Sequence, residues 1–204
     1  MTATQPFLGA VLTGGKSTRL GVDKTTLIKD GMPLAAYVGR VLQNAGAEKV
    51  VAVGGQETKA TTHSVFAAHW ADYENDQGPL AGVIAVLERL ANDVEFSKFS
   101  ACLVFAADTP NLDVTTPQEL IEHLAQDVDA DVAVLVVDDV DQPLTAAWRP
   151  TALEKVRTRY AQNERSVRAV LADLAVVRVY STNSDAINDV DVPADLDRYD
   201  LHNE

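Results

Sequence analysis

Apolar and polar residues alternate along the chain in blocks that predict strands and helices in turn. Short apolar runs predict strands, because a strand buried on both faces carries a continuous series of apolar side chains. These runs cover residues 7–12, 101–106 and 132–137, and residues 49–53 and 176–180 are predicted as further strands. Segments with apolar residues at helical spacing separate them. The regular alternation predicts a mostly parallel sheet with helices on both faces, which is a three-layer α/β/α sandwich.

The expected helices carry start and stop signals. Residues 34–45 show helical spacing and precede Gly46, a residue that suits the position just after a helix. Residues 80–90 follow a proline, which favours the first helical turn. Two capping boxes, in which a threonine precedes an acidic residue by three positions, predict further helix starts at Thr116 and Thr151.

The most informative segment follows the first apolar run. From residue 13 to residue 24 it reads Thr-Gly-Gly-Lys-Ser-Thr-Arg-Leu-Gly-Val-Asp-Lys. Paired glycines after a strand predict a tight loop whose backbone N–H groups can approach a phosphate. Lys16, Arg19 and Lys24 place three cations beside this loop. The loop and the cations together indicate a site for a polyphosphate.

Two other interpretations apply to the same segment. A Walker A loop would share its Gly-Lys-Ser-Thr stretch, but that motif needs a glycine where this chain has Ala10. Residues 10–12 also continue the apolar strand, so they do not suit a phosphate loop. An ordinary turn between a strand and a helix, with surface cations nearby, is the simpler alternative, since paired glycines are common in turns.

Residues 12–24 resemble the signature of the molybdenum cofactor guanylyltransferases. These enzymes are nucleotidyltransferases with a Rossmann-like fold of the nucleotide-diphospho-sugar transferase type. Thr13 stands where the family usually has alanine, and Leu20 where it often has methionine. Three later segments resemble family motifs in the same order, and they are residues 78–82 (GPLAG), 107–110 (ADTP) and 189–196 (DVDVPADL). The last has aspartates where the family has asparagines.

The resemblance implies one nucleotidyltransferase domain over residues 1–204, with a nucleotide-binding N-terminal half and an acceptor-binding C-terminal half. It implies catalytic roles for Arg19, Lys24 and Asp108. Either Asp72 or Asp76 corresponds to an acidic family position, because the spacing differs by about one residue. The full set of implied nucleotide-binding residues is Leu12, Thr13, Gly14, Gly15, Ser17, Arg19, Lys24, Gly54, Asp72, Gly78, Pro79, Leu80 and Asp108.

Acidic residues near the ends of the expected strands indicate a metal site. In open α/β sheets ligands bind beyond the carboxyl ends of the strands, so the glycine loop, Gly54 and Asp108 can share one crevice. The resemblance implies that Asp108 binds Mg²⁺, which prefers one or two carboxylates together with phosphate oxygens. Asp191 or Asp189 could supply a second oxygen. The simpler alternatives are that Asp108 forms a turn and that Asp191 caps a following helix.

Composition narrows the function classes. A chain of 204 residues, of which 47% are hydrophobic, can bury one core. Because Cys102 is the only cysteine, no intrachain disulfide can form, which favours a reducing, cytoplasmic location. The sequence also leads us to expect no signal peptide and no membrane span. Thirty acidic against seventeen basic residues give a net charge of −13. This charge disfavours nucleic acids and membrane surfaces as partners, and a nucleotide site would need local cations or Mg²⁺.

The resemblance implies a specific reaction. GMP would pass from Mg-GTP to the phosphate of molybdenum-bearing molybdopterin, and pyrophosphate would leave. GTP and molybdopterin would be the substrates, and transient contact with cofactor-delivery proteins is compatible with this activity. A basic surface near Arg149, Arg165 and Arg168 would suit the acceptor phosphate. The alternatives are a molybdopterin cytidylyltransferase, a phospholactate guanylyltransferase and a nucleotide-binding module without turnover.

Overall fold

The structure is a computed structural model that describes residues 5–14, 23–74, 77–181 and 183–203. Its strands are β1 (Phe7–Leu12), β2 (Ile28–Lys29), β3 (Met32–Pro33), β4 (Lys49–Val53), β5 (Ala68–Trp70), β6 (Ala101–Ala106), β7 (Val132–Val137), β8 (Val140–Trp148) and β9 (Val176–Tyr180). Its α-helices are α1 (Leu34–Asn44), α2 (Pro79–Asn92), α3 (Thr115–Gln126), α4 (Leu153–Ala161), α5 (Val167–Val170) and α6 (Pro193–Arg198). Short 3-10 turns are η1 (Lys24–Thr26), η2 (Pro150–Ala152), η3 (Leu171–Asp173) and η4 (Ser184–Ile187).

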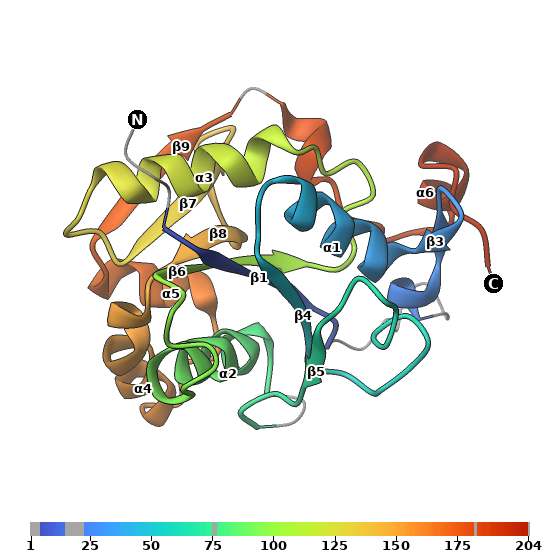
Figure 1. Cartoon of the computed structure of the whole chain (residues 1–204). Coiled ribbons are helices and arrows are strands. Elements are labelled where there is room, and N and C mark those ends of the chain that lie inside the picture. Colours follow the sequence, from blue (N-terminus) through green and yellow to red (C-terminus); the bar gives the residue numbers. More distant parts are fainter. Residues whose placement is uncertain (1–4, 15–22, 75–76, 182, 204) are drawn as a thin grey trace.

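A seven-stranded sheet in the order β5-β4-β1-β6-β8-β7-β9 forms the centre of the molecule (Figure 1). The neighbours β5, β4, β1 and β6 run parallel, and so do β7 and β9. Strand β8 is antiparallel to both β6 and β7. The predicted mostly parallel sheet is therefore confirmed, with one reversed strand that the sequence did not indicate.

Helices cover both faces of the sheet, as the sandwich prediction requires. Helices α2, α4 and α5 pack on one face, in a core that includes the fully buried Leu87 and Trp148. Helices α1 and α3 pack on the other face, around residues such as Leu42 and Phe105. Figure 1 shows the two helical layers on opposite sides of the strands. None of the helices in the described ranges is long and apolar enough to cross a membrane.

A third, smaller cluster joins two distant parts of the chain. Its buried residues are Leu27, Leu34, Val190, Tyr199 and Leu201. The backbone of Ile28 pairs with that of His202, and the Lys29 ammonium donates to the Tyr199 carbonyl at 2.8 Å. The small β2–β3 hairpin and α6 consequently lie beside each other at one end of the sheet (Figure 1). This contact brings the segment after the glycine loop to the C-terminal segment.

The two predicted capping boxes are wrong, because neither threonine side chain caps the helix that follows it. Helix α3 begins at Thr115, and Asp113 Oδ1 accepts a hydrogen bond from the Thr116 backbone N–H at 2.9 Å. The Thr151 hydroxyl donates to Asp131 Oδ1 at 3.0 Å, so it does not cap α4. In both places a carboxylate, which is a stronger acceptor than a neutral oxygen, binds the threonine that was expected to act as the cap.

Candidate functional site

The carboxyl ends of three neighbouring strands meet at one edge of the sheet. Strand β1 lies between β4 and β6, so the strands that follow it in the sequence are placed on both of its sides. The Thr13 N–H donates to the Val53 carbonyl at 2.8 Å, and the Ala107 N–H donates to the Leu12 carbonyl at 3.1 Å. These bonds place Thr13, Gly54 and Asp108 at the position where open α/β sheets bind ligands.

The Asp72 carboxylate lies among backbone positions that lack side chains. A Cβ atom at Gly54 would lie 2.5 Å from Asp72 Oδ1, and Gly54 has a φ of +78°. A Cβ at Gly14 or at Gly82 would lie 3.2 Å from an Asp72 carboxylate oxygen. Glycine is therefore required at Gly54, both for its backbone conformation and for the close approach of Asp72. Asp76 lies outside the described residues.

The GPLAG turn borders the same region. Gly78 has a φ of +84° and precedes α2, and the Tyr73 N–H donates to the Ala81 carbonyl at 3.4 Å. Gly78 and Pro79 are exposed, whereas the Leu80 side chain is fully buried in the core. Leu80 can therefore contribute to a binding site only through its backbone. The predictions for Gly15, Ser17 and Arg19 lie outside the described residues.

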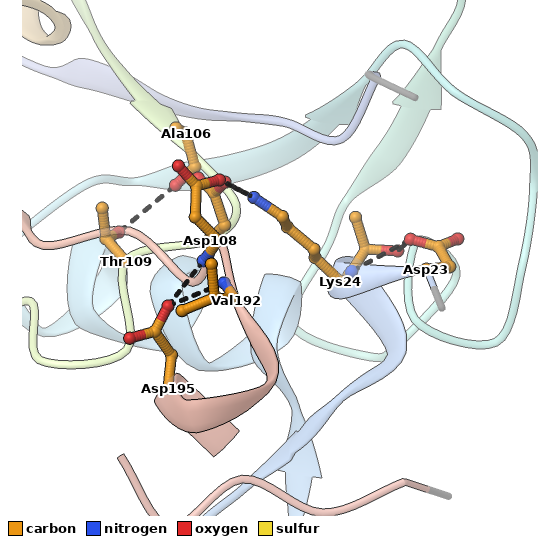
Figure 2. Close-up of polar contacts among 9 residues, drawn as sticks. Asp23, Lys24, Ala106, Asp108, Thr109, Val192 and Asp195 are labelled. Atoms are coloured by element: carbon orange, nitrogen blue, oxygen red, sulfur yellow. Dashed lines mark hydrogen bonds and ion pairs between the residues drawn. The ribbon is translucent and has the colours of Figure 1, made fainter. Parts of the chain in front are cut away.

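Lys24 links the loop after β6, which carries Asp108, to the loop before α6, which carries Asp191. Its ammonium nitrogen donates to Asp108 Oδ2 at 3.1 Å and to Asp191 Oδ1 at 2.7 Å. The Lys24 side chain is 15% exposed, so it is largely enclosed by its surroundings. Figure 2 shows it extending from η1 toward Asp108. Residues from opposite ends of the sequence thus form one charged cluster, which we call the Lys24 cluster: Lys24, Asp108 and Asp191.

The short turns that carry these side chains have local support. Asp23 Oδ1 accepts a hydrogen bond from the Thr25 N–H at 3.0 Å, which caps the turn that begins at Lys24. The Thr109 hydroxyl donates to the Ala106 carbonyl at 3.3 Å, across the bend that holds Asp108 (Figure 2). Side chains that close tight turns in this way limit the positions that their neighbours can take.

The Lys24 cluster favours a charged lysine. Burial by itself lowers the pKa of Lys24, but the hydrogen bonds and negative charges of Asp191 and Asp108 outweigh it and raise the pKa above 10.5. Partial loss of hydration, together with the charges of Asp108 and Asp191, raises the pKa of the nearby Asp189 carboxyl. The region therefore combines concentrated negative charge with the protonated ammonium of Lys24.

The alternative that Asp191 caps α6 is wrong, because the residue at the N-cap position of this helix is Val192. Asp195 Oδ2 accepts hydrogen bonds from the backbone N–H groups of Asp191 at 2.8 Å and of Val192 at 2.9 Å. The Asp191 side chain contacts Lys24 instead. The Val190 N–H donates to the Asp108 carbonyl at 3.1 Å, which ties this loop to the end of β6.

The donor set of the Lys24 cluster fits a divalent metal. One oxygen of Asp108 and one of Asp191 converge on the same ammonium nitrogen, so the two carboxylates face a common cation position. Mg²⁺ prefers one or two carboxylates completed by phosphate oxygens and water. No group of three or more His, Cys, Asp or Glu side chains arranged to hold a metal occurs within the described ranges. Any metal there would need further ligands from a substrate or from water.

The expected basic surface for an acceptor phosphate is only partly formed. Arg149 donates to the carbonyls of Asp127, Ala130 and Leu124, so it closes the end of α3 and is not available to a phosphate. Arg168 donates to the Asp141 carbonyl at 2.9 Å. Arg165 lies 3.9 Å from the centre of the Tyr160 ring, and both residues line a cavity of about 490 Å³ between α2 and α4.

Comparisons with known proteins agree with this geometry. The model of the MobA-like NTP transferase domain matches residues 9–179. The chain is 34% identical over 166 residues to a probable molybdenum cofactor guanylyltransferase of Opitutus terrae, covering 81% of this chain and 78% of the relative. It is 32% identical over 192 residues to the molybdenum cofactor guanylyltransferase of Burkholderia vietnamiensis, covering 87% of each.

A solved structure has the same fold. Molybdopterin-guanine dinucleotide biosynthesis protein A from Archaeoglobus fulgidus superposes with a TM-score of 0.70. Its sequence is 24% identical, and the match covers 94% of this chain and 96% of that one.

Proposed function

We propose that this chain, which belongs to the MobA-like NTP transferase family, transfers GMP from GTP to the phosphate of molybdenum-bearing molybdopterin. It is a nucleotidyltransferase whose curated relatives are named molybdenum cofactor guanylyltransferases. The observation that carries the proposal is the Lys24 cluster, which lies where the ends of β1 and β6 meet. The products would be the guanine dinucleotide form of the cofactor and pyrophosphate.

In this reaction the protein mainly positions the two substrates and neutralises the charge on their phosphates, and it supplies little covalent chemistry. A phosphate oxygen of the acceptor would form a bond to the α-phosphorus of GTP, and the bond from that phosphorus to pyrophosphate would break. Lys24 would donate hydrogen bonds to the triphosphate oxygens that gain charge. Backbone N–H groups of the glycine loop would hold the same phosphates, since Gly14 has no side chain to obstruct them.

We further propose that Asp108 and Asp191 hold Mg²⁺ during this reaction. When bound, the metal would polarise phosphate oxygens and orient the triphosphate. The net charge of −13 makes such local neutralisation necessary, because an acidic protein repels a nucleotide triphosphate. The glycine loop and Lys24 belong to the proposed nucleotide half of the chain, whereas Arg165 belongs to the proposed acceptor half, and the cavity that it lines lies between the two. The fully buried lone Cys102 is compatible with the proposed cytoplasmic location.

We propose that the Asp72 carboxylate recognises the base of the nucleotide. The Watson–Crick edge of guanine presents two N–H donors to an acceptor, whereas adenine presents a donor beside an acceptor. A carboxylate only accepts hydrogen bonds, so it favours guanine. Asp72 approaches Gly54 and Gly14 closely, and both follow strand ends at the proposed nucleotide site.

Asp72→Asn tests this role by its effect on nucleotide choice. We expect the unmodified protein with Mg²⁺ to bind GTP more tightly than ATP in titration calorimetry. In Asp72→Asn the affinity for GTP should fall about tenfold or more, since a hydrogen bond to a charged group contributes about 1.5–3 kcal/mol. Affinity for ATP should change little, which provides the internal control. An equal loss for both nucleotides, or none for GTP, would remove Asp72 from base selection.

A further inference from the structure

We propose that Asp195 is a positioning residue of the transfer site, which acts by fixing Asp191 beside Lys24 and Asp108. The inference rests on the proposed role of Asp191 as a metal ligand. Asp195 is not a member of the Lys24 cluster. Its carboxylate instead binds the backbone of the loop that carries Asp191.

The hydrogen bonds around Asp195 hold this loop at two consecutive residues. One oxygen, Oδ2, accepts from the N–H groups of both Asp191 and Val192, at 2.8 and 2.9 Å. In return the Asp195 N–H donates to the Val192 carbonyl at 2.9 Å. Figure 2 shows the Asp195 side chain turned back from α6 toward Val192. Because two successive amides bind one oxygen atom, the backbone at this point has little freedom to rotate.

Asp191 depends on that backbone for its direction. Its side chain is 43% exposed, so packing alone does not fix where the carboxylate points. On the N-terminal side, Val190 is fully buried and its N–H is bonded to the Asp108 carbonyl. On the C-terminal side, Asp195 provides the matching restraint. The two restraints together aim the Asp191 carboxylate at the ammonium of Lys24, 2.7 Å away.

If Asp195 only stabilised α6 as a helix cap, fewer of its observed hydrogen bonds would be explained. Helix α6 spans Pro193–Arg198 and contains no fully buried residue, and its Leu196 is only partly buried against the small cluster around Leu27 and Tyr199. The amides that Asp195 binds belong to Asp191 and Val192, which precede the helix and lie next to the Lys24 cluster. Residues that orient metal ligands in this indirect way commonly change metal affinity by about 10–100-fold when they are replaced.

Binding of Mn²⁺ to the full chain tests the inference without requiring turnover. Mn²⁺ alone serves as the probe, and its binding is followed by water-proton relaxation. Asp195→Ala should weaken Mn²⁺ binding about tenfold or more. Asp195→Asn keeps an acceptor oxygen and should retain most of the affinity. Asp197→Ala is the matched control, because it removes an equal charge from the exposed surface of the same helix and should leave binding nearly unchanged.

A double-mutant cycle separates an indirect effect from an independent one. Asp191→Ala should weaken Mn²⁺ binding at least as much as Asp195→Ala. The double variant should bind no more weakly than Asp191→Ala alone, because Asp195 has no ligand left to position. The apparent Mg²⁺ requirement for pyrophosphate release should follow the same pattern. If Asp195→Ala does not fold, Asp195→Ser takes its place with the same expected loss, since its shorter side chain cannot reach both amides.

The outcomes distinguish this inference from the proposed function on which it rests. If Asp191→Ala leaves Mn²⁺ binding unchanged, the metal role of Asp191 fails, and the positioning role fails with it. If Asp191→Ala weakens binding but the change at Asp195 does not, or if the two losses add in the double variant, only the positioning role is overturned.

Discussion

Asp108→Asn is expected to abolish nucleotidyl transfer while the protein remains folded. The change removes the negative charge that faces Lys24 and weakens the proposed metal site, whose bound ion would contribute several kcal/mol to the transition state. That loss corresponds to a fall in turnover of about a thousandfold or more. The backbone carbonyl that accepts the Val190 N–H is unchanged, so the loop should keep its position. Pyrophosphate release at saturating GTP, with thermal unfolding in parallel, measures both effects.

Asp113→Asn is the matched control for this prediction. Asp113 lies a few residues further along the chain from Asp108 and accepts hydrogen bonds at the start of α3. Asparagine is as good a residue as aspartate in such a capping position, so the variant should fold and turn over nearly normally. If Asp108→Asn stays active while Asp191→Ala is inactive, the principal metal ligand belongs to the loop before α6 and not to the end of β6.

Lys24→Ala should lower turnover by roughly two to three orders of magnitude, comparable to the loss of one preorganised donor at a transition state. The loss should appear mainly in kcat, because Lys24 is proposed to stabilise charge that develops as pyrophosphate leaves. Its raised pKa keeps it protonated throughout the neutral range, so no loss of activity from its deprotonation is expected there. Steady-state kinetics at saturating Mg²⁺ measures the change.

The stability of Lys24→Ala should fall only slightly. The variant loses contacts with two partly exposed carboxylates, and such ion pairs contribute about 0–1 kcal/mol. For a chain of this size the melting temperature should fall by about 2–4 °C or less. Lys29→Ala, which loses a contact with the Tyr199 carbonyl at a position outside the Lys24 cluster, should keep near-normal turnover. A Lys24→Ala enzyme with normal kcat would remove this lysine from the reaction.

The strands were predictable because the central ones are buried on both faces and carry nearly continuous apolar side chains, although 49–53 begins with Lys49 and 176–180 contains Arg178. The runs at residues 49–53, 101–106, 132–137 and 176–180 match observed strands, as does the first run. Strand β8 was missed because its first half is only partly buried and contains Pro143, which disfavours a strand interior. The sequence therefore indicated the layers of the sandwich, but not the strand inserted between β6 and β7.

The sequence was enough to predict which strand ends form the site. It was not enough to predict which side chains contact each other there. The family match confirms the resemblance that the glycine loop suggested. Nothing local to Lys24 indicates that it reaches Asp191, because the bond depends on packing between segments 167 positions apart. Asp195 was overlooked, although a proline at the first helical position followed two residues later by an aspartate is a recognisable helix-start pattern.

The most direct test of the account is to supply the purified chain with Mg²⁺, molybdenum-bearing molybdopterin and each of the four nucleoside triphosphates in turn. Pyrophosphate and the dinucleotide product are then measured together. The account predicts that GTP gives both products in equal amounts, that the other nucleotides give far less, and that GTP without molybdopterin gives almost none. Equal turnover of all four nucleotides, or no transfer from GTP to molybdopterin, would contradict it.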